Sequence, residues 1–174
     1  MPTNKPANPK IAGSQPYTGN SDPATAPRAG TDEFIRQVVG QCPALWNNGS
    51  YMQRNMRSDP RTLSVHACGR AIDFSYRHMP DKGIVNGRKV SLQLINLMLA
   101  NANVLGIECV LDYFPQKFGR GWRCERQRWS KYSKKTITGA GGGDWFHIEI
   151  NPAMADNPAA VRAAWVKVFG EIHN

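Results

Sequence analysis

The 174-residue chain has no apolar run of the length that crosses a membrane, and its first thirty residues lack the continuous apolar stretch of a secretory signal. A membrane helix needs roughly 18 consecutive apolar residues, and a signal peptide needs a central apolar region. We therefore expect a protein made in the cytoplasm and not inserted into a membrane. If it acts outside the cytoplasm, another component must release it.

Acidic residues are scarce: 13 Asp and Glu stand against 22 Lys and Arg, which gives a net charge of +9. A positive surface concentrates anionic partners and speeds encounter with them. Nucleic acid, anionic lipid and the anionic polymers of a bacterial cell wall all fit this description. Charge alone does not choose between them.

Cysteine is also infrequent, and the four residues Cys42, Cys68, Cys109 and Cys124 form no C-x-x-C pair. This spacing argues against a cysteine zinc finger. We expect reduced, mostly buried thiols, as is usual in a cytoplasmic protein. One or two disulfides formed after release are the alternative.

Six of the twelve prolines lie in residues 1–30, among small and polar residues. Such a composition does not offset the entropy lost on ordering, and it predicts a flexible arm or linker. The folded domain is expected over residues 31–174, a length that suits one domain with one core.

The rest of the chain mixes helical and strand patterns without regular alternation. Apolar residues at helical spacing predict a first helix from Thr31, as N-cap, to about Gly40, a second over Ser91–Asn101, and a C-terminal helix that Asn157 caps and Pro158 begins, with Ile172 on its buried face. Strand-like composition marks Ala71–Tyr76, Ile107–Tyr113 and Trp145–Ile150. The mixture predicts an α+β domain with a small antiparallel sheet flanked by helices.

Two of these segments carry residues suited to a metal. A catalytic zinc takes three nitrogen or oxygen ligands at about 2.0–2.2 Å and keeps a fourth position for water. His66 can end one strand while Asp73 lies in the next, and neighbouring strands are only about 4.8 Å apart. His147 lies on the polar face of another strand. The three side chains can therefore meet at one ion.

Asp144 comes three residues before His147, directly after Gly141, Gly142 and Gly143. In a regular strand the Asp144 and His147 side chains point to opposite faces, but a backbone that bends after glycines would let both reach a metal-bound water. A carboxylate there can act as general base. Glu149, on the same face as His147, is a candidate for orienting that imidazole.

Each of these residues also has an ordinary interpretation when taken alone. A histidine followed by an aspartate seven residues later is common by chance. His147 fits a hydrogen-bonded strand residue, and Asp144 fits a turn. His78 and His173 have the character of surface residues.

Together the two segments resemble a family. Ser64–Asp73 matches the pattern S-x-H-x-x-G-x-A-x-D, and Asp144–His147 matches carboxylate-x-x-His. These motifs are similar to those of zinc peptidases that include D-alanyl-D-alanine carboxypeptidases and the L-alanyl-D-glutamate peptidases of phage endolysins, with the zinc-binding domain of hedgehog proteins as a structural relative. The resemblance implies Zn²⁺ held by His66, Asp73 and His147, and Asp144 as base where many members have Glu.

The resemblance also implies a cation that stabilises the oxyanion formed when water attacks an amide. The family places an arginine upstream of its first histidine, which favours Arg57 and then Arg54. Arg54, Ser64 and Trp145 are the candidate substrate-binding residues. Solvated arginines are the alternative.

Residues 117–135 carry eight of the 22 basic residues, interleaved with Trp122, Trp129 and Tyr132. This composition is typical of nucleic-acid binding by stacking and phosphate contact, and it also suits a glycan strand or an anionic peptide. A solvated loop with packed aromatics is the alternative, and the glycines at 139 and 141–143 would leave its end mobile as a lid.

The expected function is that of a monomeric zinc metallopeptidase that hydrolyses bacterial peptidoglycan, the lytic enzyme of a phage or prophage, without nucleic acid as partner. Such lysins are made in the host cytoplasm and act on the wall after release. The rival enzyme is a carboxypeptidase or dipeptidase for D-Ala-D-Ala ends. The rival from another class is a basic binding module for nucleic acid or wall polymer, without stoichiometric zinc.

Overall fold

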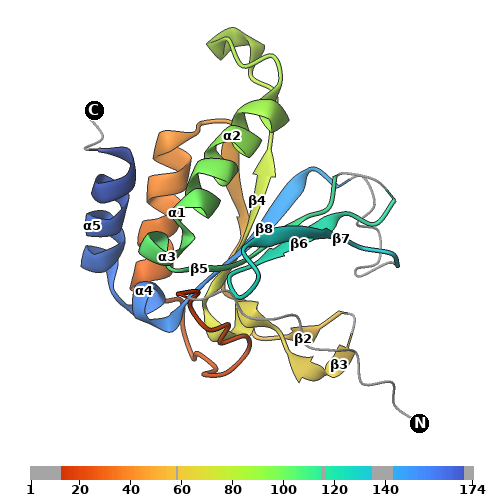
Figure 1. The fold of residues 1–174 in the computed structure, drawn as a ribbon, viewed down its shortest axis with the longest axis vertical. Coiled ribbons are helices and arrows are strands. Elements are labelled where there is room, and N and C mark those ends of the chain that lie inside the picture. Colours follow the sequence, from red (N-terminus) through yellow and green to blue (C-terminus); the bar gives the residue numbers. More distant parts are fainter. Residues whose placement is uncertain (1–12, 58, 115–116, 135–142, 171–174) are drawn as a thin grey trace.

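A six-stranded antiparallel sheet forms the centre of the protein, in a computed structural model that describes residues 13–57, 59–114, 117–134 and 143–170. Its strands lie in the order β1-β4-β8-β5-β6-β7 (Figure 1). The bounds are β1 Leu45–Gly49, β4 Ala71–Tyr76, β5 Ile107–Asp112, β6 Arg120–Arg123, β7 Arg128–Lys131 and β8 Trp145–Ile150. A separate hairpin pairs β2 (Asn55–Met56) with β3 (Asp59–Leu63).

Helices α1 (Ala29–Gln41) and α2 (Gly87–Ala100) lie against one side of this sheet, and α5 (Pro158–Phe169) packs against α1 (Figure 1). The sheet face beneath them carries Ile72, Phe74 and Ile148, which are fully buried in the core. Strand side chains alternate between faces, so the intervening residues of β4 and β8 point to the other face of the sheet. That second face carries the polar residues.

Four short helical elements connect these parts. They are the 3₁₀ helices η1 (Val65–Cys68) and η2 (Pro80–Lys82) and the α-helices α3 (Ala102–Leu105) and α4 (Pro152–Asp156). No helix in the described part of the chain combines the length and the apolar character needed to cross a membrane. All four cysteines are buried and unpaired.

The structure confirms the predicted α+β class with an antiparallel sheet. The C-terminal helix begins as predicted, since the Asn157 side chain accepts a hydrogen bond from the Ala160 N–H and Pro158 is the first helical residue. The predicted Ile172 lies outside the described residues. The second helix starts earlier than expected, at Gly87, because Asn86 caps it.

Thr31 is not an N-cap, so this prediction was wrong. The first helix begins at Ala29, and Thr31 lies inside it. Its hydroxyl is buried and donates a 2.6 Å hydrogen bond to the Gly69 carbonyl. The hydroxyl therefore ties α1 to the turn before β4 and does not satisfy the free N–H groups of its own helix.

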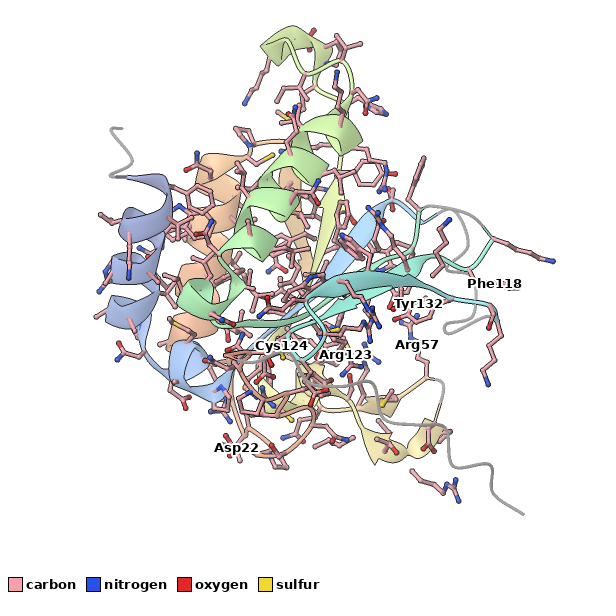
Figure 2. The ribbon with its side chains drawn as sticks, viewed as in Figure 1. Asp22, Arg57, Phe118, Arg123, Cys124 and Tyr132 are labelled. Carbon is pink, nitrogen blue, oxygen red and sulfur yellow. The ribbon has the colours of Figure 1, made fainter. Side chains whose placement is uncertain are left out.

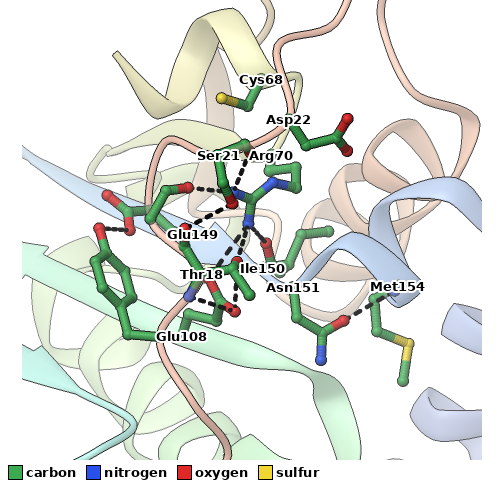
Figure 3. A network of polar contacts seen from close by, with 12 residues as sticks. Thr18, Ser21, Asp22, Cys68, Arg70, Glu108, Glu149, Ile150, Asn151 and Met154 are labelled. Carbon is green, nitrogen blue, oxygen red and sulfur yellow. Dashed lines mark hydrogen bonds and ion pairs between the residues drawn. The ribbon is translucent and has the colours of Figure 1, made fainter. Parts of the chain in front are cut away.

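Residues 13–28 also differ from the predicted flexible arm of residues 1–30. The Gln15 side chain donates a 2.6 Å hydrogen bond to the Ile107 carbonyl, and the Thr18 hydroxyl lies 2.8 Å from both carboxylate oxygens of Glu108. Buried Arg70 bonds to Thr18 and to the carbonyl of Gly19 (Figure 3). This segment is ordered because a charged pair buried in the domain, Arg70 and Glu108, needs its polar groups as hydrogen-bond partners.

Candidate metal centre

The pairing of β4 with β8 places Asp73 directly opposite His147. Directly opposed residues of an antiparallel pair share one face, and this face is the one that the helices leave free. Asp73 Oδ1 lies 2.9 Å from His147 Nδ1. Two of the three predicted ligands therefore come together through strand register alone.

The third ligand, His66, comes from η1, which precedes β4. The Ser64 side chain caps this short helix by accepting a hydrogen bond from the His66 N–H, and Gly69 ends it with φ of 65°, a left-handed conformation that favours glycine. The chain then turns back into β4. As a result His66 Nε2 lies 3.4 Å from Asp73 Oδ2.

The geometry of His66, Asp73 and His147 fits a metal ion. One ligand atom from each residue lies within 4.8 Å of the other two. Tetrahedral ligands at about 2.1 Å from an ion are roughly 3.4 Å apart. Asp73 keeps 26% of its side chain exposed, while the two histidines are nearly enclosed. The triad can hold a metal ion, and its open side is the side of Asp73.

Both imidazoles are fixed through the nitrogen that faces away from Asp73. His66 Nδ1 donates to the Ser50 carbonyl oxygen at 2.5 Å. His147 Nε2 lies 3.0 Å from Glu149 Oε1, so the His147 ring stands between Glu149 and Asp73. Partners of this kind set the tautomer and orientation of a ligating histidine. The atoms presented to an ion are therefore His66 Nε2 and His147 Nδ1.

No family model, curated protein or solved structure matches this chain. The metal centre therefore rests on the geometry and chemistry of its own residues.

In the metal-free site, electrostatic interactions favour the charged forms of Asp73 and His147. Burial raises the pKa of Asp73, but hydrogen bonds with His147 and His66 outweigh it and hold that pKa well below its usual range. Burial lowers the pKa of His147, but hydrogen bonds with Asp73 and Glu149 raise it to about 9. Without metal, His147 is an imidazolium between two carboxylates, and an ion at Nδ1 must displace its proton.

Tyr17 and Arg123 also reach this sheet face, a position that the sequence pattern does not predict. The Tyr17 hydroxyl donates a 2.8 Å hydrogen bond to Glu149 Oε2, and the Arg123 guanidinium lies 3.9 Å from the centroid of the Tyr17 ring. Arg123 opposes Cys109, which in turn opposes Glu149, so the three side chains share one face. The one available signal was that Tyr17 is the sole aromatic residue of the proline-rich segment.

Asp144 is not brought into the ligand cluster. It is exposed, directly before β8, and its carbonyl oxygen accepts a 2.9 Å hydrogen bond from the Tyr76 N–H. Burial first, and the charge of Asp144 in addition, raise the pKa of Tyr76, whose side chain lies on the core face. Gly141 and Gly142, part of the predicted bend, lie outside the described residues.

The remaining predicted residues lie around the centre. Arg57 is exposed in the turn after β2 (Figure 2), and Arg54 is half-buried, its carbonyl bonded to the Ser64 N–H. Ser64 is only 6% exposed and serves mainly to cap the helix of His66. Trp145 is half-buried on the His147 face, with its ring centroid 5.1 Å from that of Tyr113.

The basic and aromatic segment of residues 117–134 folds mainly as the β6–β7 hairpin. Trp122 is buried in the core, and Trp129 packs against that core while the Arg120 guanidinium lies 4.1 Å from its ring centroid. Trp122 therefore serves packing, and Trp129 is partly buried between the core and Arg120. Of the predicted lid, Gly139, Gly141 and Gly142 lie outside the described residues.

Proposed function

We propose that this protein is a zinc-dependent peptidase that hydrolyses amide bonds in the peptides of bacterial peptidoglycan. The observation that carries the proposal is the convergence of His66, Asp73 and His147 on one ion position with an open side at Asp73. Two imidazoles and one carboxylate, with a position left for water, are the donor set of catalytic zinc in peptidases. The resemblance of both motifs to zinc peptidases of the cell wall supports the same function.

When bound, zinc would polarise the scissile carbonyl and lower the pKa of a bound water toward about 7. The protein's own residues orient the ligands and exclude water. Glu149 and the Ser50 carbonyl hold the two imidazoles, and the burial of both histidines shields their side of the centre from solvent. Substrate therefore approaches from the side of Asp73.

Asp144 is proposed as general base, the acceptor of the proton of the attacking water. Its side chain is exposed and its residue follows Gly143, so a rotation at this position, directly before β8, can turn the carboxylate toward the face of Asp73. Arg57, or else Arg54, is proposed to stabilise the oxyanion of the substrate. Both roles require these side chains to move when substrate binds.

Peptidoglycan is proposed as substrate because the motifs resemble wall peptidases and because the net charge of +9 suits an anionic wall. We propose that the protein acts as a monomeric lysin of a phage or prophage. A carboxypeptidase or dipeptidase acting on D-Ala-D-Ala ends would use the same centre. It would differ in how far the cleft extends.

Digestion of purified peptidoglycan, with the new termini identified by mass spectrometry, tests the function. The parent is expected to release peptides with new amino termini from cross-links or stems, whereas release of D-Ala alone would indicate the carboxypeptidase. Asp144→Asn is expected to keep zinc and lose hydrolysis by about 10²–10⁴-fold. His66→Ala is expected to lose both. Full lysis by both variants would overturn the proposal.

A further inference from the structure

Glu149 uses both of its carboxylate oxygens, and only one of them serves His147. Oε1 accepts from His147 Nε2 at 3.0 Å, and Oε2 accepts from the Tyr17 hydroxyl at 2.8 Å. Glu149 is 5% exposed, so water has little access to replace either partner. The two contacts therefore fix the rotation of the carboxylate about the Cγ–Cδ bond, and Tyr17 holds one of its two oxygens.

Tyr17 in turn is held from two sides. The Arg123 guanidinium covers its ring at 3.9 Å, a cation–π contact. The next residue, Thr18, accepts a 2.8 Å hydrogen bond from Arg70 and contacts both oxygens of Glu108. Arg70 and Glu108 are themselves fully buried (Figure 3). A rigid anchor thus lies directly beside the tyrosine that contacts Glu149.

We infer that Tyr17 is a positioning residue of the metal centre, which it reaches through Glu149 and His147. The segment of residues 13–28 is then part of the site and not a linker before it. The inference rests on the proposed metal centre, but it does not depend on which bond the protein hydrolyses. Tyr17 touches neither the ion position nor the substrate in this account.

The Tyr17 hydroxyl helps to keep the His147 ring in the orientation that metal binding needs. Without the Tyr17 hydroxyl, Glu149 Oε2 becomes a buried acceptor without its donor, and the carboxylate turns to seek another. The Oε1 contact with His147 Nε2 then weakens, and the ring loses its fixed orientation. Loss of an outer partner of a ligating histidine costs about 10–100-fold in metal affinity, and Tyr17, one contact further out, is expected to cost roughly tenfold.

The test compares Tyr17→Phe with the parent in Co²⁺ and Zn²⁺ affinity and in the visible absorption spectrum of bound Co²⁺. Phenylalanine keeps the ring beneath Arg123 and removes only the hydroxyl. Tyr51→Phe is the matched control, because the Tyr51 hydroxyl also donates to the N-terminal segment, to the Ala24 carbonyl at 3.2 Å, but makes no contact with Glu149. We expect weaker binding and an altered spectrum for Tyr17→Phe, and parent behaviour for Tyr51→Phe.

A double-mutant cycle shows whether the effect passes through Glu149. In a Glu149→Ala background, Tyr17→Phe is expected to add no further loss of metal affinity, because the link is already broken. Additive losses would overturn the inference, and so would parent-like binding by Tyr17→Phe. Thermal unfolding of the metal-free variants checks that the fold is retained. If the parent itself binds no metal, the proposed metal centre is wrong. This result differs from one in which the parent binds metal and Tyr17→Phe binds it equally well.

Discussion

Asp73 and His147 face each other across the β4–β8 ladder, with Oδ1 and Nδ1 2.9 Å apart. A shift of one residue in this register would send the two side chains to opposite faces of the sheet. The register is fixed by the adjacent apolar pair of the ladder: Phe74 follows Asp73, Phe146 precedes His147, and the two oppose each other in the core. Core packing therefore aligns the metal ligands.

Glu149→Ala is expected to weaken zinc binding by about 10–100-fold, because His147 loses the acceptor at Nε2. Glu149→Gln is expected to fall between this variant and the parent, since an amide oxygen still accepts from the ring. Competition with a chromophoric chelator measures both. Equal zinc affinity in all three proteins would show that Glu149 does not orient the ligand.

Metal affinity is expected to rise with pH. The pKa of His147 in the metal-free fold is raised to about 9 from the ordinary 6.5. The protonated ring therefore adds stability to the metal-free protein that is fully present below pH 6.5 and is lost as the pH rises through 9. Since metal displaces this proton, the affinity is expected to increase by about tenfold per pH unit until it levels off near the pKa.

Competition titrations with Zn²⁺ across this pH range measure the effect. The control is His78→Gln, because His78 is exposed and lies outside the ligand triad. This variant should keep the pH profile of the parent. An affinity independent of pH would contradict the imidazolium assigned to His147.

Arg70→Met is expected to destabilise the fold by about 3–5 kcal/mol, because it leaves Glu108 as an unpaired buried charge. Both side chains are fully buried, 3.2 Å apart. The double variant Arg70→Met, Glu108→Leu is expected to be closer to the parent, since neither charge remains. Urea unfolding measures the free energy, and Arg61→Ala, at an exposed pair, should change it little. Equal losses of unfolding free energy in Arg70→Met and Arg61→Ala would contradict this account.

The four thiols are expected to resist modification in the native protein. All are buried, and burial raises the pKa of Cys109 well above its usual range and that of Cys124 to about 11. A thiol reagent at pH near 8 should react with all four only after denaturation, whether or not reductant was present. Fewer reactive thiols in the denatured, unreduced protein would reveal a disulfide.

Strand periodicity made the part of the site on β4 and β8 predictable. The alternation in Ala71–Tyr76 and Trp145–Ile150 showed which residues share a face, and both segments form strands with these bounds. His66 was expected at the end of a strand, but it lies in the short helix η1, because the Ser64 side chain caps a helical turn there; Gly69 marks the turn that returns to β4. Local pattern was sufficient for the two ligands on regular strands, Asp73 and His147, but it did not predict the helical turn that carries His66.

The outer part depends on contacts far apart in the chain, which periodicity does not record. Tyr17 lies 132 positions from Glu149, and Thr18 lies 90 from Glu108. The proline-rich composition of residues 1–30 indicated disorder. Composition does not show that the buried Arg70, far along the chain, takes carbonyl and hydroxyl groups of this segment as hydrogen-bond partners. Asp144 was expected beside the metal, but its place at the strand start is set by the Tyr76 hydrogen bond.

The zinc content of the purified protein, compared with that of His66→Ala, tests the central claim most directly. Elemental analysis after dialysis against zinc-buffered solution should find about one ion per parent chain, almost none in His66→Ala, and the parent value in the His78→Gln control. Circular dichroism of each protein confirms that the fold is present. A parent without stoichiometric zinc, or a His66→Ala variant that retains it, would contradict the account.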